Sequence, residues 1–78
     1  MTRYFFDIRY GDKIAVDEEG LELPDVEAAQ IEAAQSLAVM VCEKVNNQPF
    51  SPMAVQVRDG DGPVVEAKFV WELLHRRH

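Results

Sequence analysis

Residues 25–45 constrain the fold more than any other part of the chain, because they read as one long helix. The stretch is rich in Ala and contains no Gly or Pro, so its intrinsic preference is helical. Asp25, directly after Pro24, is typical of an N-cap, whereas Asn46, Asn47 and Pro49 favour an end there. We predict a helix over about residues 25–46, roughly 30 Å long.

Two apolar stripes run along this helix when it is wound at about 100° per residue. The broader one is predicted to form the core, with Cys42 as a small buried residue rather than a catalytic thiol. Its members are Ile31, Ala34, Leu37, Ala38, Val41, Cys42 and Val45.

The second stripe widens the apolar arc beyond what one sheet usually needs. One interpretation is that the C-terminal segment, or the loop after the helix, covers it. The other is a helix-to-helix contact in a homodimer, in which the small Ala29 and Ala33 permit close approach. We take the following residues as the possible dimer contact: Val26, Ala29, Ala33, Leu37 and Met40.

The flanks of the helix alternate with the period of strands. We predict strands at about residues 3–10, 13–17, 53–59 and 64–70. Tyr4, Phe6, Ile8 and Tyr10 would face the core together with Ile14 and Val16, and residues 17–24 would form an acidic loop. The expected class is α+β, with order ββαββ in one domain over residues 1–78. It has a four-stranded, mainly antiparallel sheet, strand order 2-1-3-4, with one long helix on one face.

Composition limits the classes of function. A chain of 78 residues is near the lower size for a comfortable core, so self-association would help it. One cysteine excludes an internal disulfide framework and a multi-cysteine zinc site. The chain has no signal-like run or membrane-length apolar stretch, so we expect a cytoplasmic protein with no membrane partner. The net charge of −6 argues against generic nucleic-acid binding over the whole surface.

Catalytic constellations are not evident in the sequence. The histidines, His75 and His78, lie in the last four residues, where nothing orients a nucleophile and its base. The Asp-Gly-Asp-Gly segment at residues 59–62 begins like a calcium loop, but Val70 stands where the closing Glu would fall. We therefore expect a hairpin turn there, no metal or cofactor, and a protein that is not an enzyme.

The outward face of the predicted sheet gathers basic residues. They are Arg3, Arg9, Lys13, Arg58 and Lys68. With Phe5 among them, this face is a possible partner-binding platform for an anionic ligand or single-stranded nucleic acid. Two alternatives stay open. The face can be solvated and laced with cross-strand ion pairs, or it can be a dimer contact.

Several segments carry a resemblance to known families. The opening RYFFDIR, the DEEGLELPD segment at residues 17–25, the helix start EAAQIEA and VRDGDGPVV at residues 57–65 resemble a family of small bacterial proteins, frequent in proteobacteria and described as a domain of unknown function. The resemblance implies a β-hairpin–helix–β-hairpin layout and no particular activity.

The order of two strands, Leu-Pro-Asp and a helix is also similar to the antitoxin domain of HicB-type toxin–antitoxin pairs, in which a small domain masks an RNA-cleaving toxin. The Gly-Cys pair usual after Leu-Pro-Asp in those domains is absent here, so this similarity implies shared architecture only.

The sequence as a whole favours a non-enzymatic binding domain that self-associates. An unidentified protein partner would use the acidic loop at residues 17–25 or the second helix stripe. Binding of an anionic ligand on the basic face and antitoxin-like masking of a partner are the alternatives.

Overall fold

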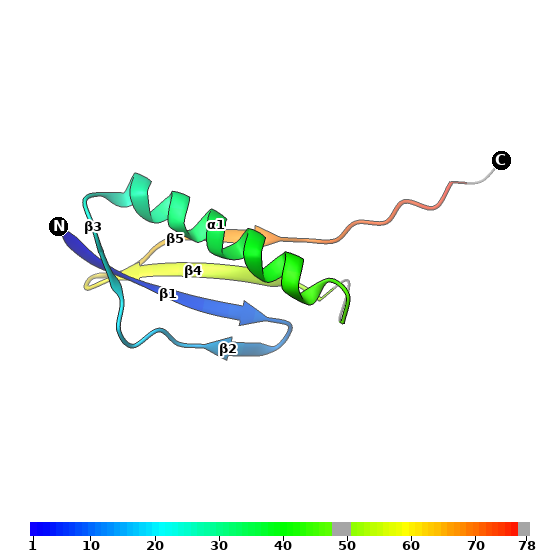
Figure 1. The fold of residues 1–78 in the computed structure, drawn as a ribbon, viewed down its shortest axis with the longest axis horizontal. Helices are drawn as coiled ribbons and strands as arrows, with labels where there is room; N and C mark the ends of the chain where they lie inside the picture. The colour runs from blue at the N-terminus through cyan, green and yellow to red at the C-terminus, as the bar shows by residue number, and fades with distance from the viewer. Residues whose placement is uncertain (48–50, 77–78) are drawn as a thin grey trace.

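The computed structural model describes residues 1–47 and 51–76, so Pro49, Arg77 and His78 lie outside the described residues. The elements are β1 (Thr2–Tyr10), β2 (Lys13–Ala15), β3 (Leu21–Leu23), α1 (Val26–Lys44), β4 (Met53–Asp59) and β5 (Gly62–Phe69). One helix packs on an antiparallel sheet of order β2-β1-β4-β5, with β3 also paired to β1 (Figure 1). The predicted α+β class and strand order are confirmed.

The returning strand after β1 is broken into two pieces. The prediction that residues 17–24 are all loop is wrong for Leu21–Leu23, which pairs antiparallel with the first residues of β1. β2 pairs with the last residues of β1, Tyr10 opposite Lys13 and Arg9 opposite Ile14. The two-residue turn sets this register, so Lys13 falls on the helix side of the sheet, whereas Ile14 lies on the opposite side. The predicted directions of Lys13 and Ile14 are therefore wrong, and Val16 is exposed rather than inward.

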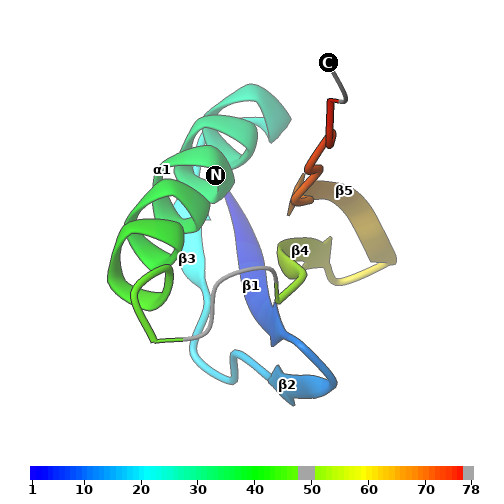
Figure 2. The same ribbon diagram turned by 90° about the vertical axis from the view of Figure 1, so that its right-hand side faces the viewer.

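α1 lies against one face of the sheet, as the end view shows (Figure 2), and the core lies between the two. Cross-strand partners share a face, so Phe6 with Val57 and Ile8 with Val55 point the same way. The fully buried side chains of β4 alternate with outward-facing ones. The buried core consists of Tyr4, Ala29, Ala33, Leu37, Met40, Met53, Val55 and Val57.

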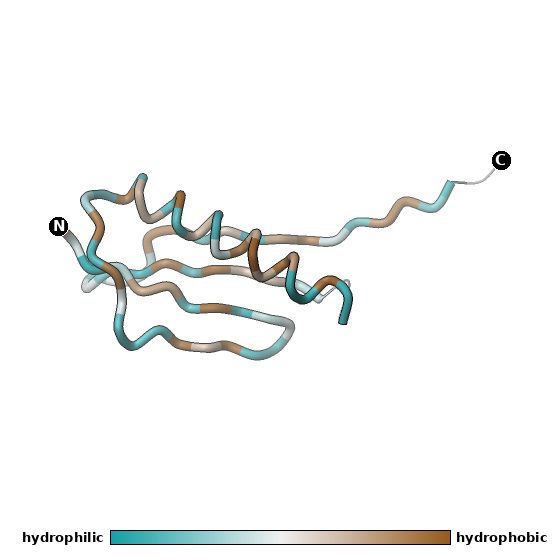
Figure 3. The backbone as a smooth tube through the Cα atoms, viewed as in Figure 1, coloured by the Kyte–Doolittle hydropathy of each residue, from teal (hydrophilic) through white to brown (hydrophobic). Residues whose placement is uncertain are grey.

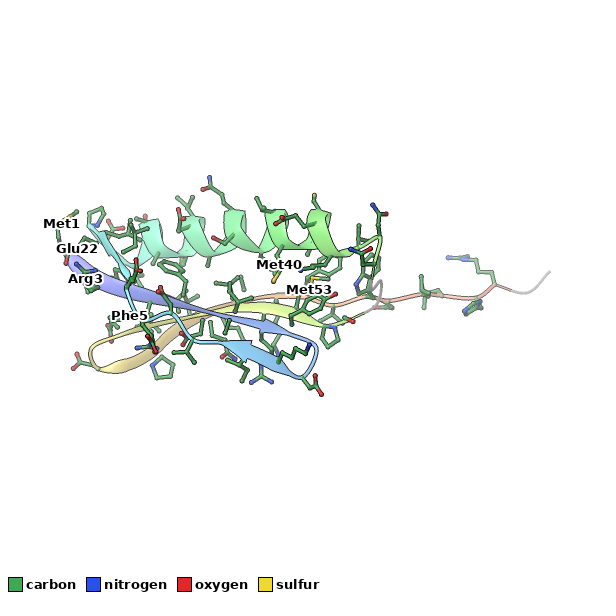
Figure 4. All side chains as sticks on the ribbon, turned by 60° about the horizontal axis from the view of Figure 1, so that its bottom comes forward. Met1, Arg3, Phe5, Glu22, Met40 and Met53 are labelled. Atoms are coloured by element: carbon green, nitrogen blue, oxygen red, sulfur yellow. The ribbon has the colours of Figure 1, made fainter. Side chains whose placement is uncertain are left out.

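The helix presents to the sheet the stripe that was predicted as a dimer contact. Ala29 and Ala33 are 0% and 1% exposed, and Met40 points down from α1 toward Met53 of β4 (Figure 4). Small side chains at these two positions let the helix approach the sheet closely, and the larger sheet residues fill the gap. Because Ala29, Ala33, Leu37 and Met40 are buried within the chain itself, the prediction that they form a dimer contact is wrong. Val26 remains partly exposed at the first turn.

The limits of α1 follow from local chemistry. Asp25 Oδ1 accepts the Ala28 N–H at 2.9 Å, which confirms the predicted N-cap and satisfies one of the free donors of the first turn. At the other end the last helical residue is Lys44, and Val45 keeps a right-handed conformation with its N–H donated to Val41 O. α1 therefore ends close to the predicted end near Asn46, and its C-cap residue is in the right-handed conformation.

Apolar side chains also line the side of α1 that faces away from the sheet. Ile31 and Val39 are 60% and 59% exposed, and Cys42 is exposed as well. The predicted burial of Ile31, Ala34, Ala38 and Cys42 is therefore wrong. Hydrophobic and hydrophilic residues alternate along the whole helix (Figure 3). We call Ile31, Ala34, Ala38, Val39 and Cys42 the outer helix face.

Residues 70–76, which we call the C-terminal arm, continue beyond β5 without regular secondary structure. The arm extends away from the body of the molecule (Figure 1). The structure with its arm has principal dimensions of 55 × 22 × 19 Å. Trp71 stays near the sheet, with its ring edge-on to Phe69 at 5.0 Å between centroids. Beyond it Leu73 and Leu74 are 60% and 73% exposed.

Candidate functional site

Two surfaces of the described chain are candidates for binding, namely the outer face of the sheet and the outer helix face. On the outer sheet face, Arg58 lies over the Phe5 ring, 4.4 Å from its centroid. Its Nε donates to Asp7 Oδ2 at 2.9 Å, and its Nη2 donates to Asp17 O at 2.7 Å. The guanidinium and the ring are therefore engaged within the chain, as in a stacked, charge-assisted pair. Phe5 lies on the side of the sheet away from α1 (Figure 4).

Asp17 is the centre of the loop between β2 and β3. Phe6 N–H donates to its Oδ2 at 3.0 Å, and the N–H groups of Gly20 and Glu19 donate to its Oδ1 at 3.1 Å. The hydrogen bond from Phe6 lowers the pKa of Asp17 below its ordinary value. The other two N–H groups and the charge of Arg58 act in the same direction, whereas partial burial opposes them.

The acidic segment at residues 17–25 is bound to β1 rather than held free in solvent. Arg3 donates from Nη1 to Glu19 O at 2.6 Å, and its Nη2 lies 3.3 Å from Glu22 Oε1. Gly20, with φ +77°, sits so close that an added Cβ would lie 2.8 Å from Arg3 Cγ and 3.0 Å from Tyr4 O. The most distinctive motif of the sequence thus has a structural role, which is to fasten the loop to the sheet.

The remaining basic residues lie at the end of the outer sheet face next to the β1–β2 turn, which we call its far end. Arg9 and Lys68 flank Ala54 on neighbouring strands, and shallow depressions run along these strands. Lys68 Nζ lies 3.8 Å from Glu66 Oε1, and Gln56 Nε2 donates to Glu66 Oε2 at 2.6 Å. Of the outward-facing basic residues within the described part of the chain, Arg9 has no ion pair. The structure therefore places Arg3, Phe5, Arg9, Arg58 and Lys68 on one face, as predicted, but most of their charge is matched locally.

The outer helix face is bordered by carboxylates. A shallow depression beside Val39 is lined by Glu32, Gln35, Ser36 and Glu43. The arrangement is an exposed apolar strip with an acidic margin, and it can bind a segment that is apolar and basic. Sequence periodicity found the strip but placed it in the core. One sequence signal could have identified the buried side of the helix. Ala29 and Ala33 are small, and small residues favour the face that packs closely on a sheet.

The side chains that could act in catalysis or bind a metal are not gathered at one place within the described residues. His75 lies on the C-terminal arm and is exposed, and His78 lies outside the described residues. Within residues 1–47 and 51–76, no three His, Cys, Asp or Glu side chains are gathered so as to hold a metal ion. In the same part of the chain, no helix has the length and apolarity needed to span a bilayer.

Comparison with known proteins gives a family and no relative of known activity. No curated protein and no solved structure matches the chain. Residues 3–70 match the family described as domain of unknown function (DUF6894), a range that covers α1 and the strands of the described chain apart from Thr2 at the start of β1. The chain therefore belongs to the DUF6894 family.

Proposed function

We propose that this chain is a non-enzymatic binding domain that self-associates through the outer helix face. The observation that carries the proposal is that α1 is apolar on both sides. The side with Ala29 and Ala33 packs on the sheet, whereas the opposite side with Ile31 and Val39 is exposed. A helix on the surface of a monomer normally turns polar residues outward, and a continuous exposed apolar strip marks an interaction surface.

The small core supports the same proposal. The residues buried between α1 and the sheet are mainly Ala, Val and Met, and one face of the sheet is open to solvent. A domain of 78 residues buries a smaller share of its surface than a larger one does. If a second copy covered the outer helix face, each Å² of apolar surface removed from water would stabilise the assembly by about 25 cal/mol.

Two neighbouring helix positions offer a matched test. Ile31 and Gln30 are both exposed, and replacing either with Glu adds one negative charge without harming helix propensity. We expect Ile31→Glu to raise the dissociation constant of the homodimer at least ~10-fold, because it puts a charge into the apolar contact. Gln30→Glu should change it little. Light scattering over a concentration series measures both, with circular dichroism to verify the fold.

Two results would contradict the proposal. One is a wild-type chain that stays monomeric at the highest concentration studied. The other is equal weakening by Ile31→Glu and Gln30→Glu, which would show a general charge effect rather than a contact at the outer helix face.

A second candidate function is binding of an anionic ligand at the far end of the outer sheet face. It is favoured by the placement of Arg9, which has no ion pair among the described residues, beside Lys68 across the small Ala54. Arg58 is unsuitable as a test position because it holds Asp7 and the loop at Asp17.

Charge reversal on one hairpin tests this candidate. We expect salt-sensitive binding of a single-stranded oligonucleotide that Arg9→Glu abolishes, whereas Lys13→Glu, on the other side of the sheet, keeps most of it. Equal loss in the two variants would mean that only net charge matters. Absence of binding by the wild type at low salt would exclude this candidate.

A further inference from the structure

We propose that the C-terminal arm of one chain docks along the outer helix face of a second copy, and that the two copies exchange arms. This inference rests on the proposed self-association and names the segment that fills the contact. The two parts to be joined are the exposed apolar strip of α1 and the exposed arm with Leu73 and Leu74.

The direction of the arm argues for a second copy rather than the arm's own helix. Phe69 is paired with Met53 and, through it, with Tyr10, and Lys44 Nζ lies 5.5 Å from the centroid of the Tyr10 ring. The arm therefore leaves the sheet at the end where α1 also ends, and it continues outward (Figure 1). To cover its own helix it would have to reverse direction. Residues 70–76, VWELLHR, contain no Gly, Pro, Asn or Asp to form a turn.

The chemistry of the two surfaces is complementary. The outer helix face is apolar, with Glu32 and Glu43 at the depression beside Val39. The arm is apolar at Leu73 and Leu74 and then basic, with His75 and Arg76, whereas Glu72 precedes the leucines. Alternate side chains of an extended segment share a side, so Leu74 can lie on the apolar strip while Arg76 lies at its acidic margin.

The area of the outer helix face also supports a role for the arm. The helix has 19 residues and is about 28 Å long. With a width of about 10 Å, its outer face gives on the order of 300 Å² in projection. A stable interface commonly buries about 800 Å² on each partner. Contact between two helix faces alone is too small, whereas the arm adds its own surface and, extended, reaches roughly 23 Å.

Exchange of arms between two copies gives a closed, twofold arrangement. Each copy offers one arm and accepts the other, so the two contacts are identical and no face is left to recruit a third chain. The expected assembly is a dimer that does not grow with concentration.

The single cysteine provides the experiment, since Cys42 lies on the outer helix face and is exposed. One full-length chain keeps Cys42. The other carries Cys42→Ser together with Leu73→Cys, Leu74→Cys or Arg76→Cys, each in a separate variant. The two chains are mixed and mildly oxidised with dissolved oxygen, so that two thiols lose two protons and two electrons to form a disulfide. Mass spectrometry then identifies the mixed dimer by the different masses of the chains.

We expect at least one arm position to form the mixed disulfide at least ten times faster than a control chain with Cys42→Ser and Asp61→Cys. Asp61 lies in the exposed β4–β5 turn, at the opposite end of β5 from the arm. A chain with Cys42 and Leu73→Cys together, oxidised at a concentration at which light scattering shows the dimer, detects the arm folding back on its own helix. Dominant intramolecular disulfide in that chain would overturn the exchange.

The outcomes of these experiments distinguish arm docking from self-association in general. A dimer by light scattering with no arm position faster than the control would overturn arm docking while leaving self-association intact. A chain that is monomeric at all concentrations would overturn both. A dimer with a fast mixed disulfide from an arm position supports both.

Discussion

At the scale of single residues, Asp17 joins the loop between β2 and β3 to β1. Its carboxylate accepts three backbone N–H groups, and its own N–H donates to Asp7 Oδ1 at 2.9 Å. The segment at residues 17–25 contains five acidic residues and was predicted to be a surface for a protein partner. The structure uses two of them, Asp17 and Glu22, to bind the loop to β1.

This network predicts how stability depends on pH. Because the folded pKa of Asp17 is lowered, the carboxylate stabilises the fold above the unfolded carboxyl pKa of about 4, and this contribution is lost as the pH falls through the folded pKa. Asp17→Asn should cost about 1–3 kcal/mol at neutral pH, the price of weakened charged hydrogen bonds.

Urea unfolding from neutral to acidic pH measures the effect. The difference between wild type and Asp17→Asn should shrink as the pH drops below about 4. A difference that stays constant through that range would show that the charge of Asp17 does not contribute.

Gly20 is the second residue whose role is set by its surroundings. Gly20→Ala should destabilise the fold by about 1–3 kcal/mol, since its φ of +77° is unfavourable for Ala and the added Cβ would meet Arg3, Phe5 and Tyr4. Gly60→Ala, where a Cβ meets nothing within 4 Å, is the matched control. Thermal unfolding compares the two, and equal effects would contradict the close approach.

At the scale of elements, α1 shows why a pattern can predict a helix and not its orientation. Apolar residues lie on opposite sides of it, so both stripes satisfy the helical period. The side with Ala29 and Ala33 packs on the sheet because its small residues permit a short distance between helix and sheet, and Leu37 and Met40 then reach the strands.

Adjacent alanines give the test of this orientation. Ala33→Leu should destabilise the chain by about 1–3 kcal/mol, because extra atoms are forced into a packed site. Ala34→Leu, one residue along on the exposed side, should change the free energy of unfolding by less than about 0.5 kcal/mol. Chemical denaturation at low protein concentration measures both. A larger loss for Ala34→Leu would mean that the opposite side of α1 faces the sheet.

At the scale of the whole molecule, the exposed large apolar side chains include Ile31 and Val39 on the outer helix face and Val70, Leu73 and Leu74 on the C-terminal arm. A dimer stabilises the folded state by mass action, so its melting temperature depends on chain concentration. We expect the Tm of the wild type to rise with concentration and that of Ile31→Glu to stay constant. Scanning calorimetry over a concentration series decides this, and a constant Tm for the wild type would contradict self-association.

The elements that have a local cause are predictable from the sequence. These elements depend on residues that are neighbours in the sequence. They are the alternating strands β1 and β4, the Ala-rich helix with its Asp25 cap, and the turns at Gly11 and Gly60. The order of the strands also follows, because one helix long enough to cross the sheet returns the chain beside its first strand.

Tertiary contacts set which side of α1 is buried, the pairing of Leu21–Leu23 with β1, and the groups that Asp17 and Arg58 bind. Each of these depends on residues distant in sequence, such as Asp7 with Arg58, and on the distance between two packed surfaces. Periodicity records how residues repeat along one element. The choice between two apolar faces is made by the shape of the surface that the element meets.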